Sequence, residues 1–336
     1  MSDRKLKVAV VGVGHLGKIH AMIYHEDPNA ELVAVIDDDG DNAEKVAAMY
    51  GCLALSDPSE IPDGVEAVSV VVPTIHHAAV AAPLLERGLP CLVEKPLAGN
   101  LEDADTILAA AKKGGALLSV GHVERFQPGV RIVREMNMEP RFIEVHRLAP
   151  FSFRAMDVGV VHDLMIHDLD LILHFVDSEI ESIDCAGGAI LTDCEDVASV
   201  RLVFANGCRA NLSASRASLE PMRRFRMFSS KGYVSLDFQK NYGLHVAKGE
   251  EWESGRVALR SADPLALALQ KDWITEKVLS VTELTLEGEQ RPLQAELAHF
   301  LDCVRTGSKP DVSGEDGRKA LALAERISAA IKEQSW

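Results

Sequence analysis

Short runs of almost purely apolar residues alternate with amphipathic stretches along the N-terminal part of the chain. The apolar runs span residues 6–11, 32–36, 67–72, 90–93 and 116–120. Apolar positions recur at helical spacing in the stretches between them, residues 17–24, 41–50, 76–86 and 101–112. Strands that are apolar throughout are typical of a parallel sheet covered by helices on both faces. The pattern therefore predicts a doubly wound sheet.

Beyond about residue 140, apolar and polar residues alternate instead. The runs on either side of Asn206-Gly207 alternate in this way, and this dipeptide is a strong signal for a short hairpin. Residues 222–229 and 233–238 form a second alternating pair. Such alternation indicates antiparallel strands with one face open to a ligand, a helix or a partner subunit.

The part of the chain beyond residue 140 also contains three segments with helical spacing. Residues 163–176 are strongly apolar, whereas residues 293–305 and 315–332 are amphipathic. Ser313 and Asp316 have the spacing of a capping box at the start of the last segment. We therefore expect the second part of the chain to combine antiparallel strands with helices.

The two patterns predict two domains, which suits a length of 336 residues. We expect an α/β protein with an N-terminal Rossmann domain, that is a doubly wound parallel sheet, in residues 1–122. Residues 123–336 are expected to form an α+β domain with an open, largely antiparallel sheet.

Composition and charge narrow the class of partner. The formal net charge is −16 and the acidic residues are dispersed, which disfavours nucleic acid and anionic membrane as partners. The six cysteines form no CxxC pair, so we expect reduced core cysteines. Because no secretory signal precedes the first strand and no apolar run has membrane-spanning length, the expected location is the cytoplasm.

The first apolar run leads into a glycine-rich turn, GVGHLG, at residues 12–17. Gly12 lets the chain turn, Gly14 lets a pyrophosphate approach the backbone, and Gly17 allows close packing of helix on strand. The helix after this turn offers free N–H groups and the positive end of its dipole to the phosphates. The alternative, an ordinary strand–helix turn, is weakened by the acidic residues at the end of the next strand.

That second strand ends in Asp37, twenty residues after Gly17, where an acidic side chain binds the adenosine ribose of a dinucleotide. Asp37 and its neighbour Asp38 would repel a 2′-phosphate. The sequence therefore predicts NAD, and not NADP, as the cofactor.

Two further strands of this sheet end in residues suited to ligand binding at its carboxyl edge. One ends in Pro73-Thr74, followed by His77. The alternative is that Pro73 simply terminates the strand and that His77 caps the next helix. The other ends in Glu94-Lys95-Pro96. A partly desolvated lysine beside a cofactor can exchange a proton with a substrate hydroxyl, whereas a solvated lysine at a strand end is the plainer interpretation.

Polar residues form a stripe on the apolar segment 163–176. Asp163, His167, Asp170 and His174 recur at spacings that place them on one helix face. Asp163 and His167 suit an acid–base pair, whereas Asp170 and His174 are expected to be structural. A metal site that adds His162 is the alternative, but the usual zinc ligand patterns are missing, so no metal is expected.

These motifs together resemble the Gfo/Idh/MocA family of NAD(P)-dependent sugar and polyol oxidoreductases over essentially the whole chain. The likeness includes the glycine turn, Pro73-Thr74, Glu94-Lys95-Pro96, GHVERF at residues 121–126, and the Asp163/His167/Asp170 spacing. It implies that Lys95, Asp163 and His167 carry the chemistry beside the nicotinamide, and that a homodimer or homotetramer forms through the C-terminal sheet. Gly159 stands alone where many members have a glycine pair, so the resemblance does not predict the shape of the loop over the active site.

Residues 121–129 and 157–173 are similar to those of family members that oxidise the 3-hydroxyl of UDP-N-acetylglucosamine to a ketone. That ketone can be aminated by an aminotransferase in lipid A biosynthesis. Arginine forks suit a diphosphate, although alternating Arg224 and Arg226 could simply lie on a solvent-facing strand. The basic residues in question are Arg125, Arg141, Arg147, Arg154, Arg216, Arg223, Arg224 and Arg226.

The expected site lies between the two domains, with Lys95 or His167 as the immediate base and Asp163 orienting the histidine. Cofactor contacts are expected from Gly12, Gly14, His15, Leu16, Gly17, Asp37, Asp38, Pro73, Thr74, His77, Glu94 and Lys95. Substrate contacts are expected from His122, Glu124, Arg125, Phe126, Arg154, Asp163, His167 and Arg216, although Arg125 and Phe126 could equally pack a hinge.

Two other functions fit the same motifs. One is a dehydrogenase of a free sugar or inositol, in which the extra arginines are structural. The other is a non-catalytic NAD-binding regulator. The joint presence of Lys95, Asp163 and His167 argues against the regulator, because a sensor needs no proton relay.

Overall fold

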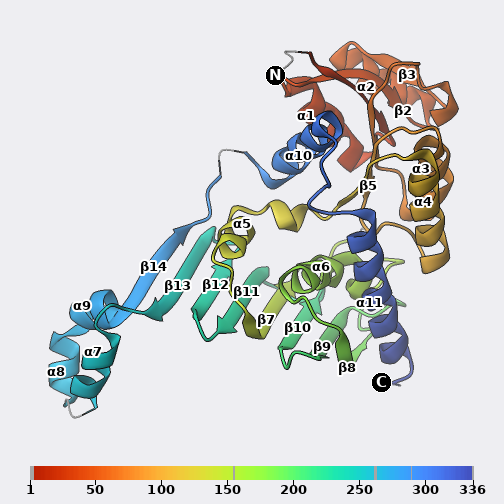
Figure 1. The fold of residues 1–336 in the computed structure, drawn as a ribbon. Helices are drawn as coiled ribbons and strands as arrows, with labels where there is room; N and C mark the ends of the chain where they lie inside the picture. Colours follow the sequence, from red (N-terminus) through yellow and green to blue (C-terminus); the bar gives the residue numbers. More distant parts are fainter. Residues whose placement is uncertain (1–3, 154–155, 261–262, 289, 335–336) are drawn as a thin grey trace. The chain divides into compact units, whose positions relative to one another are not determined.

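A computed structural model describes residues 4–153, 156–260, 263–288 and 290–334 (Figure 1). The chain divides into two compact units. The first unit comprises Met1–Phe126 and Gln290–Glu325, and the second comprises Gln127–Glu289 and Arg326–Trp336. One unit holds a parallel six-stranded sheet and the other a largely antiparallel eight-stranded sheet, so the predicted fold class is confirmed.

The first unit is built on a parallel sheet with strand order β3-β2-β1-β4-β5-β6. Its strands are β1 (Leu6–Val11), β2 (Ala30–Ile36), β3 (Leu53–Leu55), β4 (Ala67–Val70), β5 (Cys91–Glu94) and β6 (Leu118–Gly121). The chain order reverses between β1 and β4. In doubly wound sheets, ligands bind outside the carboxyl ends of the strands at such a reversal.

Helices cover both faces of this sheet and enclose two apolar cores. They are α1 (His15–Glu26), α2 (Gly40–Tyr50), α3 (His77–Glu86), α4 (Leu101–Gly114) and α10 (Pro292–Thr306), with 3₁₀ turns at Pro58–Glu60, Thr74–His76 and Val123–Phe126. One core joins the sheet to α3 and α4, and the other joins it to α1, α2 and α10. Burial on both faces explains why the strand sequences are apolar throughout.

The second unit is built on a sheet of order β14-β13-β12-β11-β7-β10-β9-β8. Its strands are β7 (Pro140–Leu148), β8 (Ile180–Gly188), β9 (Val197–Phe204), β10 (Arg209–Ser215), β11 (Met222–Ser229), β12 (Gly232–Asp237), β13 (Tyr242–Lys248) and β14 (Leu279–Thr285). Asn206-Gly207 joins β9 to antiparallel β10 as predicted, whereas β7 and β10 run parallel.

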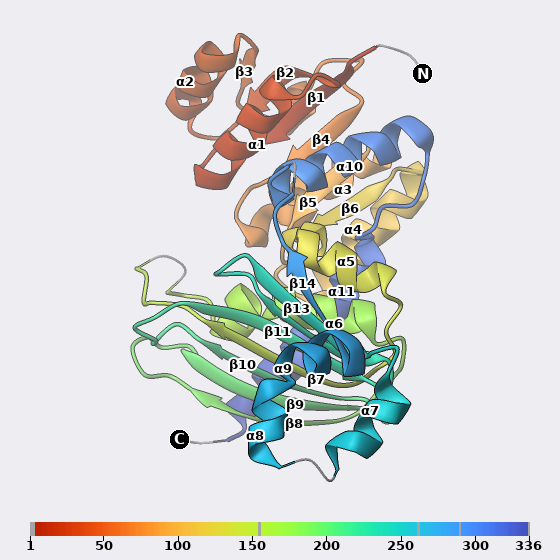
Figure 2. The same ribbon diagram turned by 90° about the vertical axis from the view of Figure 1, so that its left-hand side faces the viewer.

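Helices lie on one face of the second sheet, and the other face is open (Figures 1 and 2). They include α5 (Pro128–Glu135), a π-helical turn at Val161–Met165, α6 (Ile166–Phe175) and the last turns of α11 (Gly314–Lys332). Between β13 and β14 the chain forms α7 (Trp252–Leu259), α8 (Pro264–Leu269), α9 (Lys271–Trp273) and a π turn at Ile274–Val278. Alternate residues of the central strands are buried, as the alternating sequence indicates.

The C-terminal segment departs from the expected domain boundary. Residues 290–325 belong to the first unit, although the sequence analysis assigned everything after residue 122 to the second domain. Leu297, Phe300 and Leu301 of α10 are buried in the core that contains α1. An amphipathic helix buries its apolar stripe wherever an apolar face is available, and the sequence does not say which face that is.

The predicted capping box at the start of α11 is present. Ser313 N–H donates to Asp316 Oδ2 at 2.9 Å, and Asp316 N–H donates to Ser313 Oγ at 3.4 Å. Among the helices that the structure describes, none has the length and apolarity needed to cross a membrane.

Candidate active site

The glycine turn after β1 leaves room for a phosphate group. Gly12 has a φ of +84°, and a Cβ there would lie 2.7 Å from the Val71 carbonyl oxygen. A Cβ at Gly17 would overlap the Gly12 carbonyl oxygen, whereas one at Gly14 would meet no atom within 4 Å. Two glycines therefore serve the turn and its packing, and the third keeps a space open against the backbone.

Helix α1 begins at His15, directly after this space. No side chain caps its N-terminus, so its first N–H groups can bind a phosphate. His15 and Leu16 are exposed at this end of the helix. The open space, the N–H groups and the glycine backbone fit the pyrophosphate of a dinucleotide.

Asp37, at the end of β2, is held beside the glycine turn. Its Oδ2 accepts the Val13 N–H at 2.7 Å and the Asn42 side-chain amide at 3.1 Å. The same Asn42 amide donates to the Val13 carbonyl at 2.9 Å. Asp37 itself is half-buried, whereas Asp38 is exposed and Asp39 caps α2. The carboxylate predicted to bind the ribose is therefore fixed by the turn predicted to bind the phosphates. No pattern in the sequence marks Asn42 as the residue whose amide joins them.

We expect Asp37→Ala to raise the KM for NAD about tenfold to a hundredfold, because hydrogen bonds to a charged group contribute about 1.5–3 kcal/mol. Steady-state kinetics with varied NAD would measure this change. The matched variant is Asp38→Ala, which removes the neighbouring carboxylate and should have the smaller effect. Equal effects of the two variants would contradict the assignment of Asp37 to the ribose.

The segment after β4 contains Pro73, which is exposed, and Thr74, which starts a 3₁₀ turn. His77 is buried, with Nε2 at 3.0 Å from the Val72 carbonyl and Nδ1 at 3.0 Å from the Pro96 carbonyl. Burial lowers the pKa of His77, which favours the uncharged ring. His77 thus joins the segments after β4 and β5, and this placement gives no support to the predicted cofactor contact.

Lys95 follows β5 and is half-buried, and the Lys95–Pro96 peptide bond is cis. Glu94 is only 8% exposed, and its Oε2 accepts the Lys95 N–H at 3.1 Å. The buried carboxylate therefore contacts the backbone of Lys95, and its burial gives no support to the predicted cofactor contact.

The segment after β6 packs inside the first unit. His122, Glu124, Arg125 and Phe126 are all buried. The Arg125 Nη1 donates to the Asp311 carbonyl at 2.7 Å, and the Phe126 ring centroid lies 5.4 Å from that of His299. For Arg125 and Phe126 these contacts favour the packing alternative over a substrate contact.

The segment predicted as one α-helix has two parts in the structure. Val161–Met165 forms a π-helical turn that contains Asp163, and His167 lies in the first turn of α6. Both side chains are half-buried. The single-helix prediction is wrong at this start, because local hydrophobic spacing does not distinguish a π turn from an α turn. Single π turns occur frequently at functional sites.

The residue that holds this helix to the sheet, Asp168, is not marked by any pattern in the sequence. Asp168 of α6 accepts two hydrogen bonds from Arg147 of β7, from Nε at 2.7 Å and from Nη2 at 2.8 Å. Both side chains are buried. A bidentate pair of this kind fixes the orientation of α6, and with it that of neighbouring His167.

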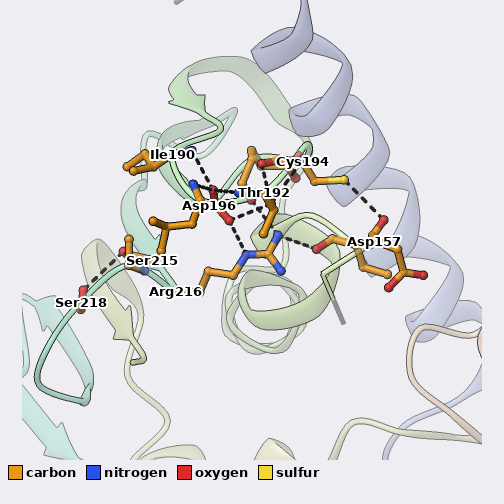
Figure 3. Close-up of polar contacts among 12 residues, drawn as sticks. Asp157, Ile190, Thr192, Cys194, Asp196, Ser215, Arg216 and Ser218 are labelled. Atoms are coloured by element: carbon orange, nitrogen blue, oxygen red, sulfur yellow. Dashed lines mark hydrogen bonds and ion pairs between the residues drawn. The ribbon is translucent and has the colours of Figure 1, made fainter. Parts of the chain in front are cut away.

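A second buried pair holds the loop before the π turn (Figure 3). Arg216 Nε donates to Asp196 Oδ1 at 2.7 Å, and its Nη2 donates to the Val158 carbonyl at 2.7 Å. The other Asp196 oxygen accepts the backbone N–H groups of Ile190, Leu191 and Thr192. Arg216 is 5% exposed, so the structure gives it a positioning role where the sequence predicted a substrate contact.

The loop before the π turn needs a glycine at position 159 because the backbone there lies against the Glu195 side chain. A Cβ at Gly159 would overlap the Glu195 carboxylate. The Val160 N–H donates to the Glu195 carbonyl at 2.9 Å, and the Asp163 N–H donates to the Gly159 carbonyl at 3.0 Å. The backbone thus passes directly over Glu195 before it turns into the segment that carries Asp163.

The arginines expected to bind a diphosphate are largely engaged with carboxylates. The ion pairs are Arg147–Asp168, Arg216–Asp196, Arg224–Asp237 and Arg226–Glu144. Arg141 donates to the Asn206 carbonyl. Arg154 lies outside the described residues. These pairings give no support to the predicted diphosphate contacts. Within the described part of the chain, no group of three or more histidine, cysteine or acidic residues could hold a metal.

Comparison with known proteins identifies the class to which this fold and site belong. Residues 6–122 match the model of an oxidoreductase family with an NAD-binding Rossmann fold, and residues 133–235 match that of the GFO/IDH/MocA C-terminal domain. The chain is therefore an NAD-binding oxidoreductase. It belongs to the Gfo/Idh/MocA family.

Similar proteins of this family extend over the whole chain. UDP-N-acetylglucosamine 3-dehydrogenase of Acidithiobacillus ferrooxidans is 34% identical over 97% of both chains. A solved structure of that enzyme matches with a TM-score of 0.85 over 98% of both chains. Inositol 2-dehydrogenase of Rhizobium meliloti is 26% identical over 98% of both chains.

Proposed function

We propose that this enzyme oxidises the 3-hydroxyl of UDP-N-acetylglucosamine to a ketone. The observation that carries the proposal is its likeness, over 97% of both chains, to an enzyme named for that reaction. Two inositol dehydrogenases that are 26% identical over 98% of this chain make a free polyol the second candidate. The paired arginines favour neither substrate.

The proposed reaction divides between the cofactor and the protein. NAD, when bound, accepts the hydride that leaves the sugar carbon. Lys95 or His167 takes the hydroxyl proton, and Asp163 orients the imidazole. The half-buried position of these three side chains supports the roles, because partial desolvation strengthens directed proton transfer.

The proposal also covers the oligomeric state of the protein, its cellular location and the enzyme that uses its product. Self-association through the open face of the second sheet would form a homodimer or homotetramer. That face carries the ion pair Arg226–Glu144 and a ring pair, Phe228 and Tyr233, with centroids 4.6 Å apart. An aminotransferase in the cytoplasm would aminate the keto sugar on the way to a diamino-sugar of lipid A.

Formation of NADH, followed by absorbance, tests the substrate. UDP-N-acetylglucosamine, glucose and myo-inositol are compared with NAD, in the presence of an aminotransferase and an amino donor to remove the ketone. We expect a signal with the nucleotide sugar alone. A signal only with myo-inositol would show that the substrate is a free polyol and not the nucleotide sugar. Tight NAD binding without any turnover would favour a non-catalytic regulator.

A further inference from the structure

A buried histidine lies beside the carboxylate that supports Lys95. His20, on α1, is fully buried, and its Nε2 lies 3.2 Å from Glu94 Oε1. The contact is electrostatic and departs from ideal hydrogen-bond geometry. Two polar side chains are rarely buried together without a purpose, because removing them from water is costly.

The structure confines the Glu94 carboxylate on its other side. Its Oε2 accepts the Lys95 N–H at 3.1 Å. A Cβ at Gly121 of β6 would lie 2.7 Å from the same oxygen, so the carboxylate lies directly against this glycine. The Glu94 carboxylate is therefore held in one position between β6 and α1, where it contacts the backbone of Lys95.

The charges around Glu94 indicate where the histidine proton lies. Burial favours the neutral acid, but His20 and Lys95 outweigh it and hold the pKa of Glu94 below its usual value. An ionised carboxylate only accepts hydrogen bonds, so His20 Nε2 carries the hydrogen. Neither His20 nitrogen makes a hydrogen bond of ideal geometry among the described residues, and Nε2 is the nitrogen that lies near the carboxylate.

The other ionisable groups around Glu94 leave this assignment unchanged. Burial, above all, raises the pKa of Tyr24, and the charges of Glu296 and Glu94 add to the shift. Its hydroxyl is paired with Ser69 at 2.8 Å. Burial lowers the pKa of His77. Both groups thus remain uncharged, and His20 and Lys95 are the groups that stabilise the Glu94 charge.

We propose that His20 is a positioning residue for Lys95, acting through the Glu94 carboxylate. The inference rests on the proposed role of Lys95 in the reaction. Helix α1 begins at the glycine turn, so the helix that offers its N-terminus to the phosphates also holds the support of the lysine. Nothing in the sequence pattern distinguishes His20 from an ordinary core residue.

The test measures the reactivity of the Lys95 amine and does not depend on substrate. His20→Ala leaves burial as the main influence on Glu94, which then takes a proton, and Lys95 loses the neighbouring negative charge. Labelling of Lys95 by trinitrobenzenesulfonate, followed by mass spectrometry of its peptide across pH, should become about three- to tenfold faster at neutral pH. Glu94→Gln should have the same effect.

Two further variants make the test specific. The double variant His20→Ala/Glu94→Gln should label no faster than either single variant, since both act through one carboxylate. His20→Gln, which keeps a donor near the Nε2 position, should restore the wild-type rate. Tyr24→Phe, on the same helix, is the control for disturbed packing and should label like the wild type.

Additive effects of the single variants, or wild-type labelling in His20→Ala, would overturn the inference. If His20→Ala does not fold, His20→Leu, which keeps an apolar side chain in the core but offers no donor, takes its place in the same comparison with Glu94→Gln and the double variant. Absence of sugar oxidation together with the expected labelling would reject the proposed function and retain the coupling of His20 to Lys95.

Discussion

Replacing Lys95 with alanine should lower kcat by about 10²- to 10⁴-fold, the range that a positioned proton-transfer group contributes. Lys95 is half-buried after β5, at the carboxyl edge of the sheet, which is where doubly wound sheets bind their ligands. Its backbone is held by Glu94, so removing the side chain leaves the support in place. Initial rates of NADH formation at saturating substrate would measure the loss.

Two variants separate chemistry from charge. Lys95→Arg keeps the positive charge but cannot release its proton near neutral pH, so we expect its kcat to stay low. Lys113→Ala removes another lysine, one paired with Glu86 on the surface, and should retain wild-type activity. A Lys95→Ala enzyme with wild-type kcat would rule out a chemical role for this lysine.

Asp196→Ala should lower the free energy of unfolding by about 3–5 kcal/mol, the typical cost of breaking a buried ion pair. The substitution leaves the Arg216 guanidinium buried without its carboxylate, and three backbone N–H groups lose their acceptor. Denaturant unfolding of the apoenzyme would measure the change. Because the same pair holds the loop before Asp163, activity should fall as well.

Arg318→Ala provides the matched control. It breaks an ion pair with Asp105 that is largely exposed to solvent, so the expected change is about 0–1 kcal/mol. Equal destabilisation by the two variants would contradict the structural role of Asp196.

The pH dependence of stability is tied to the same residue. Burial raises the pKa of Asp196, but the hydrogen bonds from Leu191, Ile190 and Thr192 outweigh burial and hold the pKa well below its usual value. A carboxyl group with a depressed folded-state pKa stabilises the protein above its unfolded-state pKa. That contribution is lost as the pH falls below about 4, and Asp196→Ala should lack this part of the acid transition.

The parts of the fold that local sequence determines could be predicted. Gly12 and Gly17 have the packing that their spacing indicates, and Asn206-Gly207 forms its hairpin. The first strand was predicted at its observed bounds, Leu6–Val11. Burial on both faces and tight turns leave a strong signal in consecutive residues.

The parts that depend on distant partners could not be predicted. Arg147 and Arg216 resemble available anion-binding side chains until the structure pairs them with Asp168 and Asp196. The same holds for Asn42, whose amide links Asp37 to the glycine turn. A side chain's partner is set by tertiary packing, so no spacing within the sequence identifies it.

The first unit is discontinuous in the chain, which has a consequence for synthesis on the ribosome. Its cores contain Phe300 of α10 and Leu321 of α11, although its sheet is complete at residue 121. The nascent sheet therefore exposes apolar surface throughout translation of the second unit. We expect this surface to attract chaperones until α10 and α11 emerge, and the NAD-binding unit to complete its folding after the second unit has formed.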